Sequence, residues 1–436
     1  MAKKPKKESG CTFLGIEFPS IKKDELVRNI AIIAFLSLIT KFVLINVTTG
    51  IFQSFIDLFD ISLYLEYAAQ IAGGQIPYID FSLPYPILFL IPALLPLPFA
   101  LITQNAMTYV FAYQAFMSLF DIVIAILVYF IALKIHNKQS AFIAGIMYAT
   151  AFSAAYFTIT KYDAFPTMFL MLGLMMTIYG MKNGGYVSII LGFFAKMFSL
   201  IALPYTLLFN SEKTDLKSEI IAVLKYGIPV FIILLVPVLI ISPSNIMTYL
   251  SAAGSGFEVY VNTPTYTIHA LLLPAGIDLP AETISIFMYL AMVILGLYLL
   301  ATAYIKKIGN EKNLLAFVFL TIFITIFFSK FHSPQYLLWI SPFIALFLVP
   351  NYRDIVLFYL FQAVAYIEFP LMWGGYYMNH TYTGELYSAN WYTTLVFFIF
   401  EYLVMLYIVY RIITLNGDFK DKLESLTQAI SQRKQT

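Results

Sequence analysis

The sequence predicts an all-α integral membrane protein, built as a polytopic helical bundle with about ten full crossings. Of the 436 residues, 61% are hydrophobic and only 11% are charged, whereas soluble domains carry about 25% charged residues. Apolar runs of roughly 20 residues, the length a helix needs to cross a bilayer, recur along the whole chain. The single cysteine, Cys11, excludes an intramolecular disulfide framework, and the net charge of +2 gives no reason to expect nucleic acid.

Ten stretches have the length and apolarity of complete crossings. They lie near 29–48, 108–134, 140–158, 164–181, 219–241, 284–305, 313–329, 334–350, 354–372 and 391–413. Two further stretches are ambiguous, because 85–103 is interrupted by four prolines and 186–209 carries Lys196 in its middle. Hydrophobicity alone does not decide whether these two cross the membrane.

The distribution of lysine and arginine decides the topology. Basic residues accumulate in short cytoplasmic loops, and the basic leader places the N-terminus inside. If 85–103 forms juxtamembrane helices in the first outer loop and 186–209 enters and returns as a short helical hairpin, only Lys161 and Lys330 fall outside. Full crossings would instead move three loop lysines outside, namely Lys134, Lys138 and Lys182. The sequence therefore predicts that both termini are cytoplasmic.

The predicted organisation is one membrane-embedded unit with polar ends. Its parts are a cytoplasmic basic leader, a membrane module with the first outer loop, a second outer loop, C-terminal membrane helices and a cytoplasmic tail. Their bounds are 1–28 for the leader, 29–242 for the module with its loop at 49–107, 243–282 for the second loop, 283–413 for the helices and 414–436 for the tail. The outer segments exceed what a helix connection needs, and such loops often carry function.

The first outer segment offers a candidate catalytic acid. Asp60 and Tyr64 stand four residues apart, so on a helix they share a face. The Gly73-Gly74 pair and several prolines then turn the chain back toward the membrane. Asp60 could be the N-cap of this helix, a catalytic base, or both.

Two shorter outer turns hold basic residues against the charge bias. Lys161 and Asp163 could form a surface ion pair worth less than about 1 kcal/mol, or they could line a site. Lys330 lies two residues before His332, which offers a proton carrier or a neutral donor. A lysine kept outside needs a partner, and an anionic lipid headgroup is the obvious one.

Charged residues at membrane depth are costly and are functional candidates by default. Lys41, Asp121, Lys196 and Glu401 lie at this depth, and Lys41 and Asp121 are expected to form a structural pair between the first two crossings rather than a proton relay. Nucleotide-binding and zinc-binding motifs do not occur in the chain. No cofactor and no metal site are therefore expected, although Asp60 and Asp163 could hold a divalent ion loosely.

Three segments carry a resemblance to a known family. The first runs from Asp60 to Pro86, the second is Tyr162-Asp163 with the later run AKMFSLIALP around Lys196, and the third is HSPQYLLWISP from His332 to Pro342. In this order they resemble polytopic glycosyltransferases of the GT-C superfamily, most closely the family 87 group that uses polyprenyl-phosphate mannose. The chain departs from that pattern in 243–282, which has no lysine or arginine where a phosphate contact is expected.

The resemblance implies roles for individual residues. Asp60 would be the catalytic base, with Asp163 and His332 near the reaction centre. Lys161 and Lys330 would lie near the lipid phosphate. The matched segments also imply further substrate-binding residues: Tyr64, Asp80, Tyr85, Gln335 and Tyr336.

The function that the resemblance implies is hexosyl transfer, with mannose as the expected sugar. The donor would be a polyprenyl-phosphate sugar, and the acceptor a glycan, a glycolipid or a protein on the non-cytoplasmic face of the cell membrane. Expected partners are this donor, the acceptor and membrane lipids. The alternatives are a secondary transporter or lipid-linked-sugar flippase, which would have broken helices facing each other at the midplane, and a noncatalytic subunit with the same fold.

Overall fold

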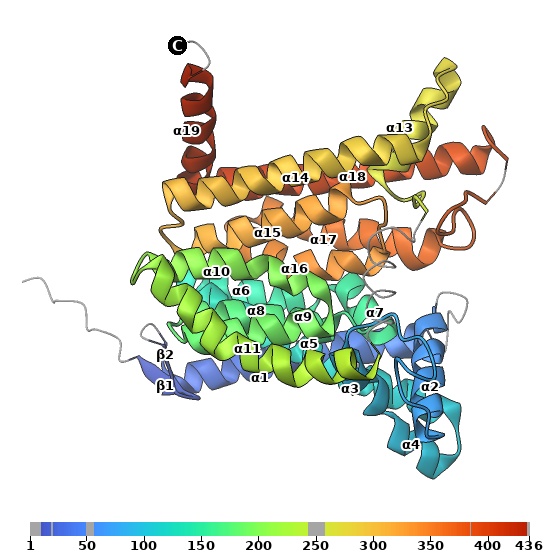
Figure 1. Ribbon diagram of the computed structural model, residues 1–436, viewed down its shortest axis with the longest axis horizontal. Helices are drawn as coiled ribbons and strands as arrows, with labels where there is room; N and C mark the ends of the chain where they lie inside the picture. The colour runs from blue at the N-terminus through green and yellow to red at the C-terminus, as the bar shows by residue number, and fades with distance from the viewer. Residues whose placement is uncertain (1–9, 19–20, 49–55, 243–257, 384, 434–436) are drawn as a thin grey trace, which may run out of the picture.

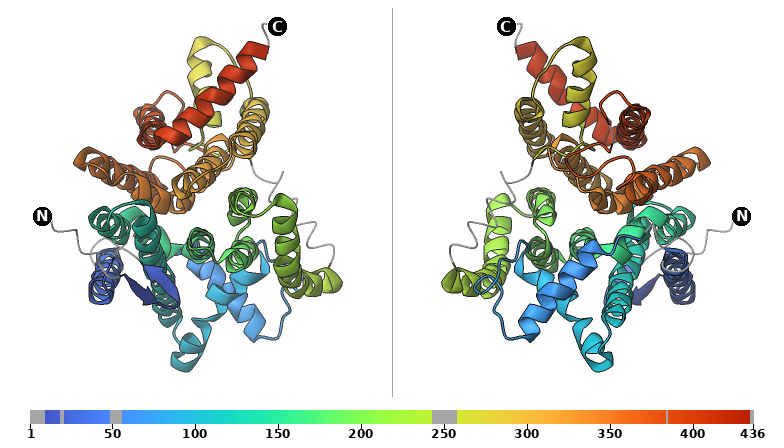
Figure 2. Two further views of the ribbon diagram at one scale, coloured as in Figure 1. Left: turned by 90° about the vertical axis from the view of Figure 1, so that its left-hand side faces the viewer. Right: turned by 90° about the vertical axis from the view of Figure 1, so that its right-hand side faces the viewer.

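The computed structural model describes residues 10–18, 21–48, 56–242, 258–383 and 385–433. Long helices run side by side along the longest axis of the molecule (Figure 1). Helices α1 (Lys23–Asn46) to α11 (Leu216–Ile241) form one half of the bundle, and α13 (Pro264–Leu272) to α19 (Gly417–Arg433) form the other, as the end views show (Figure 2). Parts of both predicted long outer loops, 49–55 and 243–257, lie outside the described residues.

The multi-pass helical character is confirmed. Seven described helices are long and apolar enough to cross a membrane. They are α1, α5 (Ala106–Ile135), α11, α14 (Ala281–Lys306), α15 (Glu311–Phe328), α17 with its π-helical end (Tyr352–Met372) and α18 (Ala389–Leu415). An eighth span results if α6 (Lys138–Ala149) and α7 (Phe152–Thr160), bent by 47° against each other, are counted as one. The number of ten is not confirmed, because α8 (Ala164–Ile178) and 334–347 are shorter.

The two ambiguous stretches are both broken. Residues 85–103 form a 3-10 turn (Ile87–Phe89), α3 (Leu90–Leu94) and α4 (Leu97–Thr103), which lie beside α2 (Phe59–Ala72) at one end of the bundle (Figure 1). The second stretch divides at Lys196, whose extended backbone separates α9 (Lys182–Ala195) from a 3-10 turn (Met197–Ile201) and α10 (Ala202–Ser211). The predicted breaks are therefore present, and the position of these helices relative to the membrane stays a prediction.

The N-terminal leader departs from the all-α prediction. Two short strands, β1 (Cys11–Phe13) and β2 (Ile16–Phe18), pair antiparallel with Cys11 opposite Phe18. Leu14 and Gly15, both with positive φ, form the two-residue turn between them, as tight hairpins require. Phe18 is buried against the rings of Phe130 in α5 and of Tyr179, so apolar packing holds the hairpin in place. Its strands have three residues each, which is too short for a hydrophobic period to show in the sequence.

Helices begin where a polar side chain can satisfy the first free backbone N–H groups. The side chain of Asn105 accepts from Met107 N at 2.9 Å, that of Asn310 from Asn313 N at 2.9 Å, and that of Ser388 from Trp391 N at 3.3 Å. These caps set the starts of three candidate spans, α5, α15 and α18. The polar residues that cap these helices thus stand where the apolar runs of the sequence begin, and they fix the starts of the spans.

Helix α16 (Leu337–Phe347) joins the two halves. Every one of its residues is buried, and it packs against α5, α6, α7 and α8 of one half and against α15 and α18 of the other. Apolar surface on all sides of a helix is the pattern of a fully enclosed element. The third family-like segment, which continues into α16, therefore lies at the centre of the molecule.

The expected structural pair between Lys41 and Asp121 is confirmed. Lys41 of α1 forms an ion pair with Asp121 of α5, and both side chains are almost completely buried. Tyr148 donates from its hydroxyl to Asp121 Oδ1 at 2.6 Å, and Lys41 Nζ donates to Ser37 Oγ at 2.7 Å. With these additional partners the charges are satisfied inside the helix bundle, which is what buried ion pairs need.

Candidate functional site at the α2 end

Three carboxylates and two lysines gather at the end of the bundle that carries α2. Lys161, which follows the last residue of α7, places its Nζ 2.7 Å from Asp57 Oδ2 and 3.0 Å from Asp60 Oδ2. The lysine side chain is 7% exposed and the Asp60 side chain 19% exposed. Burial alone would lower the pKa of Lys161, but the charges of Asp60 and Asp57 together raise it above its usual value, so the lysine stays protonated.

Asp60 is not the N-cap of α2. Leu58 occupies the cap position, and Asp57 Oδ1 accepts from the backbone N of Phe59 at 3.0 Å. Asp60 lies in the first turn, where a negative charge is favoured by the helix dipole. Tyr64, one helical turn later, donates from its hydroxyl to Asp60 Oδ2 at 3.4 Å, so the predicted shared face of Asp60 and Tyr64 is confirmed.

Asp163 has different partners. Its Oδ1 accepts from Lys196 Nζ at 2.6 Å and from Trp339 Nε1 at 2.6 Å, and the residue is completely buried. The suggested surface pair between Lys161 and Asp163 is therefore wrong: both residues are buried, and each has an ionic partner from another segment. The second oxygen, Asp163 Oδ2, receives no hydrogen bond from the described residues.

Lys196 is held at the break between α9 and the following 3-10 turn by aromatic rings as well as by Asp163. Its Nζ lies 4.9 Å from the ring centroid of Tyr162 and 5.1 Å from those of Tyr336 and Trp339, within the range of cation–π attraction. Trp339 is itself stacked between Phe198 and Tyr336, with centroids 3.9 and 4.0 Å away. A cation at this position is thus compensated on several sides, although its side chain is 18% exposed.

A second group of aromatic rings borders Asp60. Tyr64 meets Tyr85, Tyr113 and Tyr162 with ring centroids 5.6–6.0 Å apart, and Tyr85 lies 5.4 Å from Tyr162. Burial, and then the neighbouring charge of Asp60, raise the pKa of Tyr64. Tyr64 therefore remains neutral, and these tyrosines form an aromatic wall beside Asp60.

His332 and Lys330 approach the same region from the segment before α16. His332 is buried, its ring lies 6.3 Å from that of Tyr336, and burial lowers the pKa of His332 to about 4. The histidine is thus neutral near pH 7. Among the described residues neither a hydrogen bond nor an ion pair joins it to Asp60 or Asp163. Lys330 accepts from Tyr260 N through its backbone oxygen at 2.9 Å.

Two sequence-predicted residues have local roles instead. Asp80 is exposed and accepts from Ile76 N at 2.7 Å, which closes the turn that follows α2. Gln335 accepts from Ser333 Oγ at 2.5 Å. The structure thus brings together Asp60, Tyr64, Tyr85, Lys161, Asp163 and Tyr336, and leaves Asp80 at the periphery.

Three site residues were missed by sequence reasoning. Asp57 lies three residues before Asp60 and shares its lysine, and Lys196 supplies the second cation. The sequence analysis identified Lys196 as a charge at membrane depth. Such charges are functional candidates by default, and this was the signal that could have assigned Lys196 to the site. Trp339 gave no such signal, because one tryptophan in an apolar helix is ordinary.

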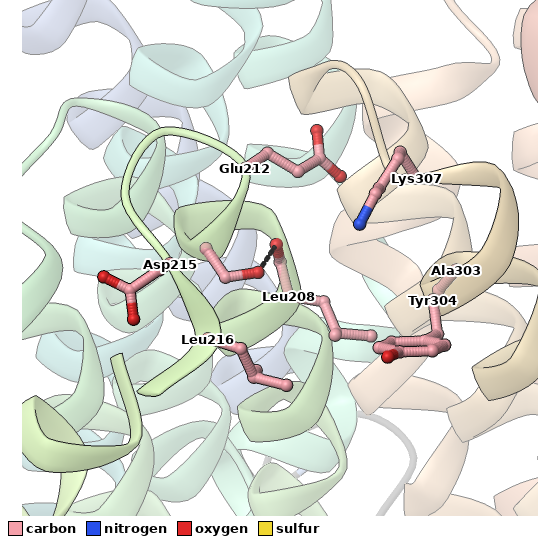
Figure 3. Close-up of a pocket in the computed structure, with 8 residues that line it drawn as sticks. Leu208, Glu212, Asp215, Leu216, Ala303, Tyr304 and Lys307 are labelled. Carbon is pink, nitrogen blue, oxygen red and sulfur yellow. Dashed lines mark hydrogen bonds between the residues drawn. The ribbon is translucent and has the colours of Figure 1, made fainter. Parts of the chain in front are cut away.

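A pocket of about 250 Å³ lies at the opposite end of the bundle (Figure 3). It is formed where the α10–α11 turn faces the α14–α15 turn, and Glu212, Asp215 and Lys307 line it. The Glu212 carboxylate accepts from the backbone N of Ile308 at 2.5 Å and of Gly309 at 3.0 Å. Glu212 therefore serves to fasten the two turns together, at the end away from the Asp60 cluster.

The site carries formal charges that nearly balance. Three carboxylates (Asp57, Asp60 and Asp163) face two ammonium groups (Lys161 and Lys196), and His332 adds none. Within the described residues there is no group of three or more His, Cys, Asp or Glu side chains placed to hold a metal. Asp60 and Asp163 each have a lysine counter-ion in place of the shared divalent ion that the sequence left open.

Such a cluster can do two things chemically. A carboxylate held ionised beside a lysine can accept a proton from a hydroxyl group, and the lysines can stabilise negative charge on a phosphate oxygen. A comparison of the chain with models of known protein families and with curated proteins finds no match. The functional argument consequently rests on these residues and on the resemblance of the three segments.

Proposed function

We propose that this protein is a membrane glycosyltransferase that uses a polyprenyl-phosphate sugar. In this proposal it moves a hexose, expected to be mannose, to a glycan, glycolipid or protein acceptor on the non-cytoplasmic face of the membrane. The observation that carries the proposal is the contact of Lys161 with Asp60 and Asp57 at 3.0 and 2.7 Å, close in space to the Lys196–Asp163 pair. All three family-like segments contribute to this one cluster.

Asp60 has the properties of a general base. The acceptor hydroxyl must lose its proton as its oxygen forms a bond to the anomeric carbon of the donor sugar. Asp60, 19% exposed in its side chain and fixed by Lys161 and Tyr64, would receive that proton. A positioned general base typically contributes about 10² to 10⁴ in rate.

The leaving group needs charge stabilisation and no acid. As the bond from the anomeric carbon to the phosphate oxygen breaks, its electron pair stays on the lipid phosphate, which leaves as an anion. Lys196, with its Nζ in a wall of aromatic rings, and Lys161 are the cations of the cluster. Charge stabilisation of this kind is strongest where water is excluded, and most of the cluster is buried.

The proposed orientation suits a lipid-linked donor. Helix α2, which carries Asp60, lies at one end of the bundle (Figure 1), so the polyprenyl chain could stay in the bilayer while its phosphate reaches the surface. A transporter or flippase would be expected to keep its charged site near the midplane. The position of the acids at the bundle end thus favours transfer over transport.

The test compares sugar transfer by purified, reconstituted wild type and Asp60→Asn. The substrates are radiolabelled polyprenyl-phosphate mannose or glucose with membrane glycolipids as acceptors. We expect transfer by the wild type and a loss of about 10² or more in the variant, because the amide keeps the shape but cannot take a proton. Glu66→Gln is the matched control, since Glu66 is an exposed acid of the same helix.

Each outcome has a definite meaning. Loss of transfer in Asp60→Asn with an unchanged Glu66→Gln supports the enzyme and its base. Equal transfer by all three proteins keeps the enzyme and rejects Asp60 as its base. No transfer by the wild type from any lipid-linked sugar rejects the proposal in favour of the transporter or subunit alternatives.

A further inference from the structure

Two buried glutamates lie apart from the Asp60 cluster, in the C-terminal half. Glu368 belongs to the π-helical end of α17 and Glu401 to the middle of α18, and their exposures are 0% and 3%. Their carboxyl groups are within hydrogen-bonding reach of each other. Among the described residues no lysine, arginine or histidine forms an ion pair with either of them, in contrast to every carboxylate of the Asp60 cluster.

A third polar side chain reaches this pair from the segment before α13. Asn262, 3% exposed, donates from Nδ2 to Glu368 Oε1 at 2.6 Å. Tyr377 donates its hydroxyl to the same oxygen at 3.4 Å. These contacts come from three separate stretches of chain, so the group is built by the fold and does not arise from neighbours in sequence.

Each of the three side chains keeps one acceptor atom without a hydrogen bond. Asn262 Oδ1, Glu368 Oε2 and Glu401 Oε1 are each buried and receive no hydrogen bond from the described residues. Buried polar atoms normally have partners, and two unpaired buried carboxylates would be strongly unfavourable. Protons could neutralise the two glutamates, whereas a divalent cation would balance the same two charges and also take up the oxygen of Asn262.

We propose that Asn262, Glu368 and Glu401 form a binding site for a hard divalent cation of the Ca²⁺ or Mg²⁺ class. Two carboxylates balance the charge of one such ion, and carboxylate and amide oxygens are the ligands these ions prefer. Rotation of the Asn262 amide exchanges its nitrogen and oxygen, so that the oxygen faces the carboxylates. The Tyr377 hydroxyl is a fourth oxygen within reach of the same carboxylate.

Such an ion would fasten the segment before α13 over the membrane helices. The residues before Asn262 continue this attachment, since Tyr260 N donates to Lys330 O at 2.9 Å and Val261 N to Asn379 O at 3.0 Å. The ring of Tyr260 lies 4.6 Å from that of Phe331, which lies 5.8 Å from the ring of Tyr336 in the cluster, so this segment lies beside the Asp60 cluster. An ion at Glu368 and Glu401 would therefore order the segment that borders that cluster.

The experiment measures ion binding by the full chain, purified in detergent and stripped of metal with a chelator. Ca²⁺ and Mn²⁺ alone are titrated, and bound ions are counted by radioactive calcium and by manganese paramagnetic resonance. We expect one saturable ion per chain that raises the unfolding temperature. Glu401→Gln and Glu368→Gln should each weaken binding by more than about tenfold, as loss of metal-site residues commonly does.

Two further variants keep the test decisive. Glu385→Gln removes an exposed outer acid and should leave binding unchanged. Asn262→Asp adds a third carboxylate, so it should tighten binding even if the glutamine variants fail to fold. The proposal is overturned if the wild type binds no saturable ion, if Glu401→Gln binds as the wild type does, or if Asn262→Asp binds no more tightly. These readouts do not depend on sugar transfer.

Discussion

At the scale of single residues, Lys161 balances the negative charge of the Asp60 cluster. Its Nζ is the described counter-ion of both Asp57 and Asp60, so Lys161→Met would leave two carboxylates facing each other. Removing one partner of a buried ion pair typically costs about 3–5 kcal/mol. We expect a lower unfolding temperature, measured by thermal denaturation in detergent, and partial recovery when Asp57→Asn is added. Lack of any recovery in the double variant would contradict this account.

His332 provides a residue-scale prediction about pH. Its pKa is lowered to about 4 in the folded protein by burial, against about 6.5 in the unfolded chain. Between these values only the unfolded state binds the proton, so stability is complete above pH 6.5 and falls as the pH drops toward 4. The loss amounts to about 3 kcal/mol at 1.36 kcal/mol per pKa unit.

The measurement is the midpoint of denaturant unfolding followed from pH 7 to pH 4. His332→Gln should flatten this dependence, because it removes the titrating ring. His380→Gln, a change at a partly exposed histidine between α17 and α18, serves as the control and should retain the wild-type dependence. An equally steep loss in His332→Gln would assign the acid sensitivity to other groups.

At the scale of elements, the break at Lys196 depends on a close approach of backbones. A Cβ added at Gly192 would lie 2.7 Å from Ser199 Oγ and 3.1 Å from Phe169 Cβ, so α9 could not fold against the following turn in the same way. We expect Gly192→Ala to destabilise the protein by about 1–3 kcal/mol through overpacking, and to weaken transfer by shifting Lys196 from Asp163. Gly296→Ala in α14, where a Cβ meets nothing within 4 Å, should have neither effect in thermal denaturation and transfer assays.

The positions of the helices were largely predictable from the sequence, whereas the ion-pair partners of the charged residues were not. The predicted stretch 108–134 corresponds to α5 at Ala106–Ile135, and 391–413 to α18 at Ala389–Leu415, because apolar length and polar caps are local properties. The pairing of Lys161 with Asp57 and Asp60 depends on how α2 lies against the end of α7. That arrangement is set by side-chain packing, which neither hydropathy nor charge bias encodes. Asp163 pairs with Lys196, and the suggested ion pair with Lys161 was wrong.

At the scale of the whole molecule, the arrangement of turns supports the predicted orientation. The α5–α6, α8–α9, α10–α11, α14–α15 and α16–α17 turns lie at the end that carries α19 (Figure 1). Most loop lysines and arginines belong to these turns, including Lys138, Lys182 and Lys307. Basic loops stay on the cytoplasmic side, so the α2 end is expected to face outward.

The single cysteine makes this orientation testable without a background of other thiols. Cys11 lies in the hairpin at the α19 end, so a membrane-impermeant maleimide should label it only after the cells are permeabilised. A cysteine introduced as Glu385→Cys, in a Cys11→Ser background, should be labelled in intact cells, because Glu385 is exposed in the segment between α17 and α18 at the opposite end. Labelling of Cys11 in intact cells, together with protection of position 385, would show that the orientation is the reverse of the predicted one. The Asp60 cluster would then lie on the cytoplasmic face, and a donor whose sugar faces outward would be ruled out.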